Sequence, residues 1–332
     1  MANPISPPSG YRKRVGIALG SGSARGIAHV GILQALREMD IEPDIVCGSS
    51  IGALVGACYL SGHLDEFADW VCGLSTTAVL RFMGIRLLAQ GGVAEAGKLI
   101  QHLRETFGDH AIEDLPKPYA AVATDLYRGR EVWLQQGSVW DAVRASIAIP
   151  GLLTPVPYGN RWLVDGGLVN PVSVSLCRAL GADVIIAVNL NTIRRQQPEL
   201  AIAPPTVEDA EAQAQEETLA AEELPTPEAG LFGRLTSSLR GDTTPLRGLW
   251  AGGDQDPAPV MPGTLNVVLS SLNVMQDRIT RSRLAGEPPD VVLAPRLAEL
   301  GLLEYTRGAE ALEEGRACVL RMQDAIRHAL EA

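Results

Sequence analysis

From Val15 onward, short apolar runs alternate with longer stretches in which apolar residues recur at helical spacing. Short β-rich runs predict strands, and apolar residues repeating at three and four positions predict helices. The predicted strands are residues 15–20, 45–49, 119–125, 131–135, 162–165, 184–189 and 291–294. The predicted helices are residues 27–39, 51–61, 97–106, 171–180, 265–284 and 306–329. This alternation favours an α/β fold in which helices cover both faces of a sheet.

Residues 196–263 interrupt this alternation. The segment is rich in Pro, Glu, Ala, Thr and Gly and has no sustained strand or helix period. Because the pattern resumes directly after Pro262, we interpret the segment as a disordered insertion rather than a domain. The expected organisation is a flexible N-terminus, 1–13, followed by one domain, 14–332, that contains the insertion.

Charge is distributed unevenly along the 332 residues. The chain has 28 Lys and Arg and 39 Asp and Glu, which gives a net charge of −11. The insertion holds 12 of the acidic residues and 3 arginines, so its net charge is −9. An acidic chain lacks the clustered cations that neutralise a nucleic-acid backbone, so no nucleic-acid partner is expected. The acidic insertion is predicted to repel anionic membrane surfaces, to gate access to the site or to meet a basic partner.

The cysteines and the N-terminus bear on the compartment. Five cysteines without CxxC spacing support neither a disulfide framework nor a zinc ribbon. No secretory signal peptide and no run of about 18 apolar residues is present. A cytoplasmic protein without a metal site is expected.

The first chemical motif is a Gly-x-Ser-x-Gly sequence, Gly48 to Gly52, that follows a predicted strand and enters a predicted helix. A serine on such a sharp turn needs small neighbours, which Gly48 and Gly52 supply. The turn leaves the Ser50 hydroxyl exposed at the start of a helix. Ser50 is therefore a candidate nucleophile.

The second motif is a glycine-rich turn, residues 20–26, at the start of another predicted helix. Unpaired backbone N–H groups at such a turn can bind a phosphate or stabilise an oxyanion. Arg25 adds a positive charge there or forms a surface ion pair. The spacing of Gly20, Gly22 and Gly26 also suggests dinucleotide binding, but the chain has no Tyr-x-x-x-Lys pair and its second strand ends in a serine rather than a ribose-binding carboxylate. A nicotinamide-dependent oxidoreductase is a minor alternative.

A serine nucleophile needs a base. In the order Ser, Asp or Glu, His, only His328 follows the best acidic candidate, Asp165, and it lies on an amphipathic helix where solvent exposure is expected. His29 is expected to pack on its own helix. Asp165 ends an apolar strand and precedes Gly166 and Gly167, which lets its carboxylate approach another loop; by itself an Asp-Gly pair is often only a turn.

Together, these segments resemble the patatin-like phospholipase family over residues 14–190 and from 264 to the last helix. The sequences of the first glycine-rich block and of residues 273–289 resemble its bacterial RssA-type branch. The resemblance implies an α/β/α sandwich with a mostly parallel sheet, in which Ser50 is the nucleophile and Asp165 its dyad partner. It makes residues 21–26 the oxyanion loop, usually written GGGxRG, and residues 145–150 the ASxAxP block near the site. Serines replace glycines at 21 and 23. The implied oxyanion residues are Gly22, Ser23, Ala24 and Arg25, supported by Gly20, Gly26, Gly48, Gly52, Gly166 and Gly167.

The resemblance also implies a reaction. The family hydrolyses carboxylic esters of lipids or phospholipids through an acyl-enzyme, without cofactor or metal. A lipid or ester substrate is therefore expected, and peripheral membrane contact and oligomeric state are left open. The rival hypothesis is a non-catalytic interaction protein that uses the acidic insertion.

Overall fold

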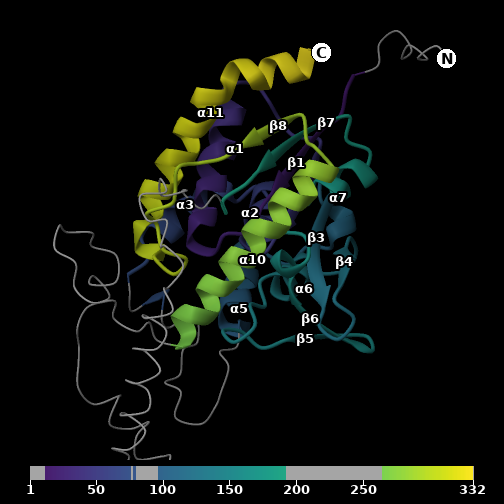
Figure 1. Ribbon diagram of the computed structural model, residues 1–332, viewed down its shortest axis with the longest axis vertical. Coiled ribbons are helices and arrows are strands. Elements are labelled where there is room, and N and C mark those ends of the chain that lie inside the picture. Colours follow the sequence, from purple (N-terminus) through teal and green to yellow (C-terminus); the bar gives the residue numbers. More distant parts are fainter. Residues whose placement is uncertain (1–11, 76–77, 80–95, 192–263, 332) are drawn as a thin grey trace, which may run out of the picture. The chain divides into compact units, whose positions relative to one another are not determined.

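A computed structural model describes residues 12–75, 78–79, 96–191 and 264–331 of the chain (Figure 1). Its centre is an eight-stranded sheet. The strands are β1 Val15–Leu19, β2 Ile45–Ser49, β3 Tyr119–Asp125, β4 Arg130–Leu134, β5 Val156–Tyr158, β6 Arg161–Asp165, β7 Val184–Val188 and β8 Val291–Leu293. Their order is β5-β6-β3-β2-β1-β7-β8, with β4 also paired to β3. Pairs among β1, β2, β3, β7 and β8 are parallel, whereas β3–β4, β3–β6 and β5–β6 are antiparallel.

The central strands are buried on both faces. Ile17 and Leu19 of β1 belong to one hydrophobic core, and Ala18 between them belongs to a second core on the other face. Consecutive strand residues point to opposite faces, so a strand covered on both sides needs apolar residues at every position. This explains why the sequence shows continuous apolar runs there rather than alternation.

Helices cover both faces of the sheet. The larger core lies against α1 Ala28–Glu38, α2 Ile51–Leu60, α3 Leu64–Cys72, α5 Gly97–Phe107, α6 Val139–Ser146 and α11 Gly308–Glu331. The smaller core lies against α7 Val174–Ala179 and α10 Thr264–Gly286, and Figure 1 shows α10 crossing this face of the sheet. Short 3₁₀ turns are η1 Ser23–Ile27, η2 Ile112–Asp114, η3 Gly166–Leu168 and η5 Tyr305–Arg307. The expected α/β/α sandwich with a mostly parallel sheet is confirmed.

Among the described residues, the predicted helices and strands are present with shifts of a few residues at their ends, and two α-helices and one strand were not predicted. These are α3, α6 and the short strand β5. The predicted insertion 196–263 and residues 1–11 lie outside the described residues, so the domain organisation stays a prediction. Within the described ranges, no helix is both long enough and apolar enough to cross a membrane.

Candidate active site

The sheet brings Ser50 and Asp165 together because β2 and β6 pair with the same edge of β3, one after the other, while β4 pairs with its other edge. Ser49, the last residue of β2, pairs with Val122, and Asp165, the last residue of β6, pairs with Ala123. Since β2 is parallel and β6 antiparallel to β3, their C-terminal ends meet head on at these neighbouring positions. Two residues 115 apart in sequence are thereby placed side by side.

The two side chains form a direct hydrogen bond. Ser50 Oγ donates to Asp165 Oδ2 at 2.5 Å, and Asp165 Oδ1 accepts from the Gly167 amide at 2.7 Å. The Asp165 amide itself donates to Ala148 O at 2.9 Å. Ser50 is 4% exposed and Asp165 1% exposed. The carboxylate is held through both oxygens, with one of them aimed at the serine hydroxyl.

Ser50 has a strained backbone, with φ 55° and ψ −124°, between β2 and α2. Close packing enforces this turn: a β-carbon on Gly52 would lie 2.1 Å from Leu19 O, and one on Gly48 would lie 2.4 Å from Ala53 N. The Ser50 amide donates to Ser146 Oγ at 2.9 Å, and that hydroxyl donates to Val122 O at 2.6 Å. Ser146 lies in the 145–150 block and anchors the strained turn to β3.

Burial sets the charge behaviour of the site. Removal from water raises the pKa of Asp165 to about 6, while the hydrogen bonds from Ser50 and the Gly167 amide lower it. The same effect lowers the pKa of His29 to about 4, so this histidine is neutral. His29 Nε2 donates to Gly20 O at 2.8 Å, and His328 is exposed on α11. The hydrogen-bond partner of the Ser50 hydroxyl is therefore Asp165 and not His29 or His328.

The glycine-rich loop adjoins the serine, and its four predicted donors differ. The Ala24 amide donates to Leu302 O at 3.0 Å and the Arg25 amide to Gly22 O at 3.2 Å. Among the described residues, the amides of Gly22 and Ser23 have no such partner. The buried Arg25 side chain turns away, with Nε donating to Leu300 O at 2.8 Å. Burial lowers the Arg25 pKa, and within the described part of the chain no carboxylate pairs with it.

The predicted glycines share one property. A β-carbon on any of them would lie 2.1–2.6 Å from a neighbouring atom, so each marks a close approach between parts of the site. These glycines are Gly20, Gly26, Gly48, Gly52, Gly166 and Gly167. In the described ranges, no group of three or more His, Cys, Asp or Glu side chains could hold a metal ion.

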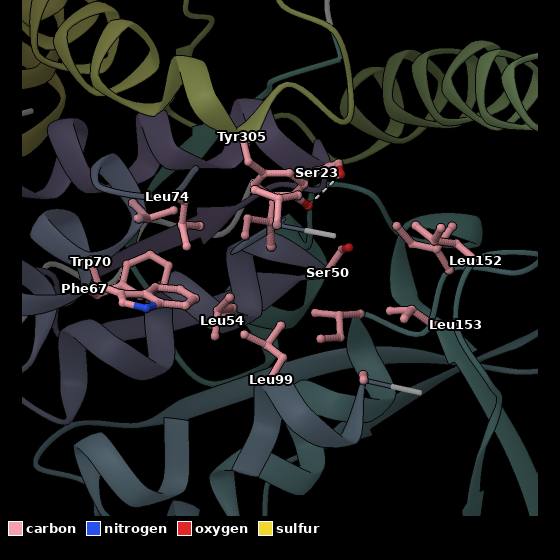
Figure 2. Close-up of a pocket in the computed structure, with 16 residues that line it drawn as sticks. Ser23, Ser50, Leu54, Phe67, Trp70, Leu74, Leu99, Leu152, Leu153 and Tyr305 are labelled. Atoms are coloured by element: carbon pink, nitrogen blue, oxygen red, sulfur yellow. Dashed lines mark hydrogen bonds between the residues drawn. The ribbon is translucent and has the colours of Figure 1, made fainter. Parts of the chain in front are cut away.

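Ser50 opens onto an apolar pocket of about 790 Å³, its open mouth included (Figure 2). Its polar side chains close to Ser50 are those of Ser23 and Tyr305. The apolar lining includes Leu54, Phe67, Trp70, Leu74, Leu99, Ile147, Ile149, Leu152 and Leu153.

A second, smaller pocket of about 440 Å³ also reaches Ser50 and contains most of the polar groups. Gln276 and Asn273 of α10 line it together with Ser21 and Asp165. Ser21 Oγ donates to Gln276 Oε1 at 3.1 Å and accepts from Asn191 Nδ2 at 3.1 Å. Sequence reasoning missed these α10 residues. Their spacing of three on the helix face that also carries Leu269 and Leu272 is the signal that could have found them.

Comparisons with known proteins agree with this geometry. Residues 17–177 match the family model for patatin-like phospholipase. Uncharacterized NTE family proteins of Mycobacterium bovis and Mycobacterium tuberculosis are 34% identical, over 94% of this chain and 92% of theirs. Lysophospholipase nte1 of Emericella nidulans is 34% identical over 56% of this chain, which spans only 12% of that protein. Fold, site and relatives support lipid hydrolysis, and the chain belongs to the patatin-like phospholipase family.

Proposed function

We propose that this chain is a serine acyl hydrolase that cleaves the ester of a lipid carrying a single acyl chain, with Ser50 as nucleophile and Asp165 as base. The observation that carries the proposal is the 2.5 Å hydrogen bond from Ser50 Oγ to Asp165 Oδ2, at the junction of an apolar and a polar pocket. A weak nucleophile needs an adjacent proton acceptor, and this carboxylate is the acceptor in place.

The reaction follows from the placement of these groups. Ionised Asp165 takes the Ser50 proton as Oγ attacks the ester carbonyl carbon. The amides of Gly22 and Ser23 stabilise the negative charge on the carbonyl oxygen. Asp165 then passes its proton to the leaving alcohol, which leaves an acyl-enzyme. A water molecule, deprotonated by Asp165, attacks the acyl carbon; the bond to Ser50 Oγ then breaks, Asp165 returns the proton to Oγ, and the fatty acid is released.

The two pockets support a monoacyl lipid as substrate. The apolar pocket suits one acyl chain, because its lining offers almost no polar partner. The polar pocket suits the alcohol and headgroup, since Ser21, Asn273 and Gln276 supply hydrogen-bonding groups there. The name lysophospholipase carried by the fungal relatives is consistent with this division.

The test compares wild type with Ser50→Ala and Asp165→Asn on p-nitrophenyl butyrate and on lysophosphatidylcholine. Ser50→Ala is expected to lower kcat/KM by about 10⁴-fold or more, and Asp165→Asn by about 10³-fold. Ser49→Ala is the matched control, because Ser49 is a neighbouring buried serine whose hydroxyl has no hydrogen-bond partner within the part of the chain that the structure describes. It should retain activity.

Labelling with a fluorophosphonate probe gives an independent measurement. Ser50 should be labelled in wild type and in Ser49→Ala. Turnover and labelling that persist in Ser50→Ala would refute the nucleophile. An unlabelled and inactive wild-type protein would favour the non-catalytic interaction protein.

A further inference from the structure

The oxyanion loop is held by a segment from the other end of the chain. Arg25 Nε donates to Leu300 O at 2.8 Å, and the Ala24 amide donates to Leu302 O at 3.0 Å. Ser23 Oγ and Tyr305 Oη form a hydrogen bond of 2.9 Å. Three consecutive loop residues are therefore bound, in antiparallel order, by residues 300–305. This segment lies outside the residues matched by the family model, 17–177.

Ser23 is the residue in this loop that most needs an anchor. Its φ is 52°, in the left-handed region where a glycine is comfortable and a residue with a β-carbon is strained. Such a conformation persists only where surrounding contacts hold it. A serine at this position brings the strain and also the hydroxyl that Tyr305 binds.

Tyr305 reaches the reaction centre from η5. It is half-buried and lines the apolar pocket together with Ser23 and Ser50. Figure 2 shows its ring directed toward Ser23 above Ser50, with the hydrogen bond between the two hydroxyls. Burial raises the Tyr305 pKa, the bond to Ser23 lowers it, and the negative charge of Asp165 raises it further. The phenol therefore lies within the electrostatic field of the dyad.

We propose that Tyr305 is a positioning residue for ester hydrolysis: its hydroxyl holds Ser23 in the left-handed conformation and so aims the Gly22 and Ser23 amides at the substrate carbonyl oxygen. The inference rests on the proposed function of the site. A donor in an oxyanion hole acts on the transition state, so a loosened loop lowers kcat rather than raising KM.

The experiment uses the full chain with Tyr305→Phe, Ser23→Ala, their double variant, and Ser23→Gly with and without Tyr305→Phe. Tyr305→Phe keeps the ring in the pocket and should lower kcat on p-nitrophenyl butyrate about 10-fold, with KM changed less than about 2-fold. Ser23→Ala should lose about as much. The double variant should lose no more than either, because both remove one bond.

Ser23→Gly provides the rescue. Glycine adopts φ 52° without help, so Tyr305→Phe in this background should change kcat less than about 2-fold. Tyr158→Phe, which removes an exposed tyrosine hydroxyl elsewhere, is the matched control and should match wild type. Any of three results would overturn the proposal. Tyr305→Phe could keep the wild-type kcat, or the two losses in kcat could multiply in the double variant. Alternatively, Tyr305→Phe could lower kcat as much in the Ser23→Gly background as in wild type.

Hydrogen exchange separates this inference from the proposed function. Exchange of a peptide covering residues 20–27 should be faster in Tyr305→Phe than in Tyr158→Phe, whether or not Ser50 is the nucleophile. Unchanged exchange refutes the anchoring role even if turnover falls. Turnover that survives Ser50→Ala refutes the nucleophile and leaves the exchange result to decide the role of Tyr305 in the loop.

Discussion

Two parts of the chain meet at Ser50, and they are built differently. In residues 15–177 the site rests on strand ends and on glycine contacts so close that a β-carbon would lie within 2.6 Å of a neighbour. In residues 264–331 it rests on hydrogen bonds, which include the side-chain bonds between Ser21 and Gln276 and between Ser23 and Tyr305. The first part fixes where Ser50 and Asp165 lie. The second determines what surrounds them, through long side chains that can be exchanged without moving a strand.

The difference separates the reaction from its selectivity. The Ser50–Asp165 pair depends on pairing at Val122 and Ala123, which no surface change reaches. The polar pocket depends on α10, whose outer side is exposed at Val274 and Met275. Changes in the first part should therefore abolish the fold or the reaction, and changes in the second should shift substrate preference.

The largest effect is expected for Gly52→Ala. The new β-carbon would lie 2.1 Å from Leu19 O, and because this oxygen belongs to the backbone and a β-carbon has no rotamer, no side-chain rotation relieves the clash. We expect a loss of more than about 3 kcal/mol in the free energy of unfolding, with loss of esterase activity. Urea unfolding measures it. Gly97→Ala is the control, since a β-carbon there meets nothing within 4 Å and should be neutral or stabilising. Wild-type stability in Gly52→Ala would contradict the close packing.

The rate should follow the ionisation of Asp165. Burial raises the pKa of this carboxyl to about 6, and only its ionised form accepts the Ser50 proton. We expect kcat/KM for p-nitrophenyl butyrate to rise with an apparent pKa near 6 and to fall about 10-fold for each pH unit below it. A profile that is flat from pH 5 to 8 would rule out Asp165 as the base.

Stability should respond in the opposite direction. The folded pKa of Asp165 exceeds its unfolded value, so the folded state binds this proton more tightly. The resulting stabilisation is present below about pH 4 and is lost as pH rises through 6. At pH 8, Asp165→Asn should therefore be more stable than wild type by about 1–3 kcal/mol, and the difference should shrink toward pH 4.5. Urea unfolding at three pH values measures it; a difference independent of pH would assign the effect to another cause.

The sequence predicted most of the first part and little of the second. Ser50 and Asp165 are visible because their strands are apolar and end in glycine-flanked polar residues. The order of the strands in the sheet cannot be predicted from the local sequence pattern. The contact between the ends of β2 and β6 could therefore be predicted only from the resemblance to the family. β5 was missed because it has three residues and contains Pro157.

The second part could not be predicted because its contacts are long-range. Tyr305 follows a segment without periodicity, and nothing local links it to Ser23, 282 residues earlier. Gln276 looks like an ordinary polar position of an amphipathic helix until α10 is placed over the pocket. Ser146 was located through its block, but its bond to the Ser50 amide depends on where α6 packs.

Acyl-chain preference should shift when the apolar pocket is narrowed. Leu99 of α5 is half-buried and lines this pocket, so Leu99→Trp should occupy space that a long chain needs. The ratio of kcat/KM for p-nitrophenyl palmitate to that for p-nitrophenyl butyrate should fall about 10-fold. Leu320→Trp, at a position 60% exposed on α11, is the control and should leave the ratio unchanged. An unchanged ratio in Leu99→Trp would show that the acyl chain does not bind in this pocket.

The smallest effect is expected in the second part, for Gln276→Met. Methionine keeps the length of the side chain but removes the Oε1 acceptor that Ser21 Oγ and Asn191 Nδ2 share. The free energy of unfolding should fall by about 1 kcal/mol. If the polar pocket binds the headgroup, as proposed, kcat/KM should fall about 3- to 5-fold on lysophosphatidylcholine and less than 2-fold on p-nitrophenyl butyrate.

Ser282→Ala, exposed on the same helix, is the control for Gln276→Met. If Gln276→Met lowers kcat/KM equally for both substrates, α10 acts on the reaction itself through Ser21 and the oxyanion loop. The division between the two parts of the chain is then wrong. If the lysophospholipid alone is affected, α10 selects the headgroup while the strand ends carry out the chemistry. Since the same helix that contacts the loop also lines the pocket, only the ratio between the two substrates separates these outcomes.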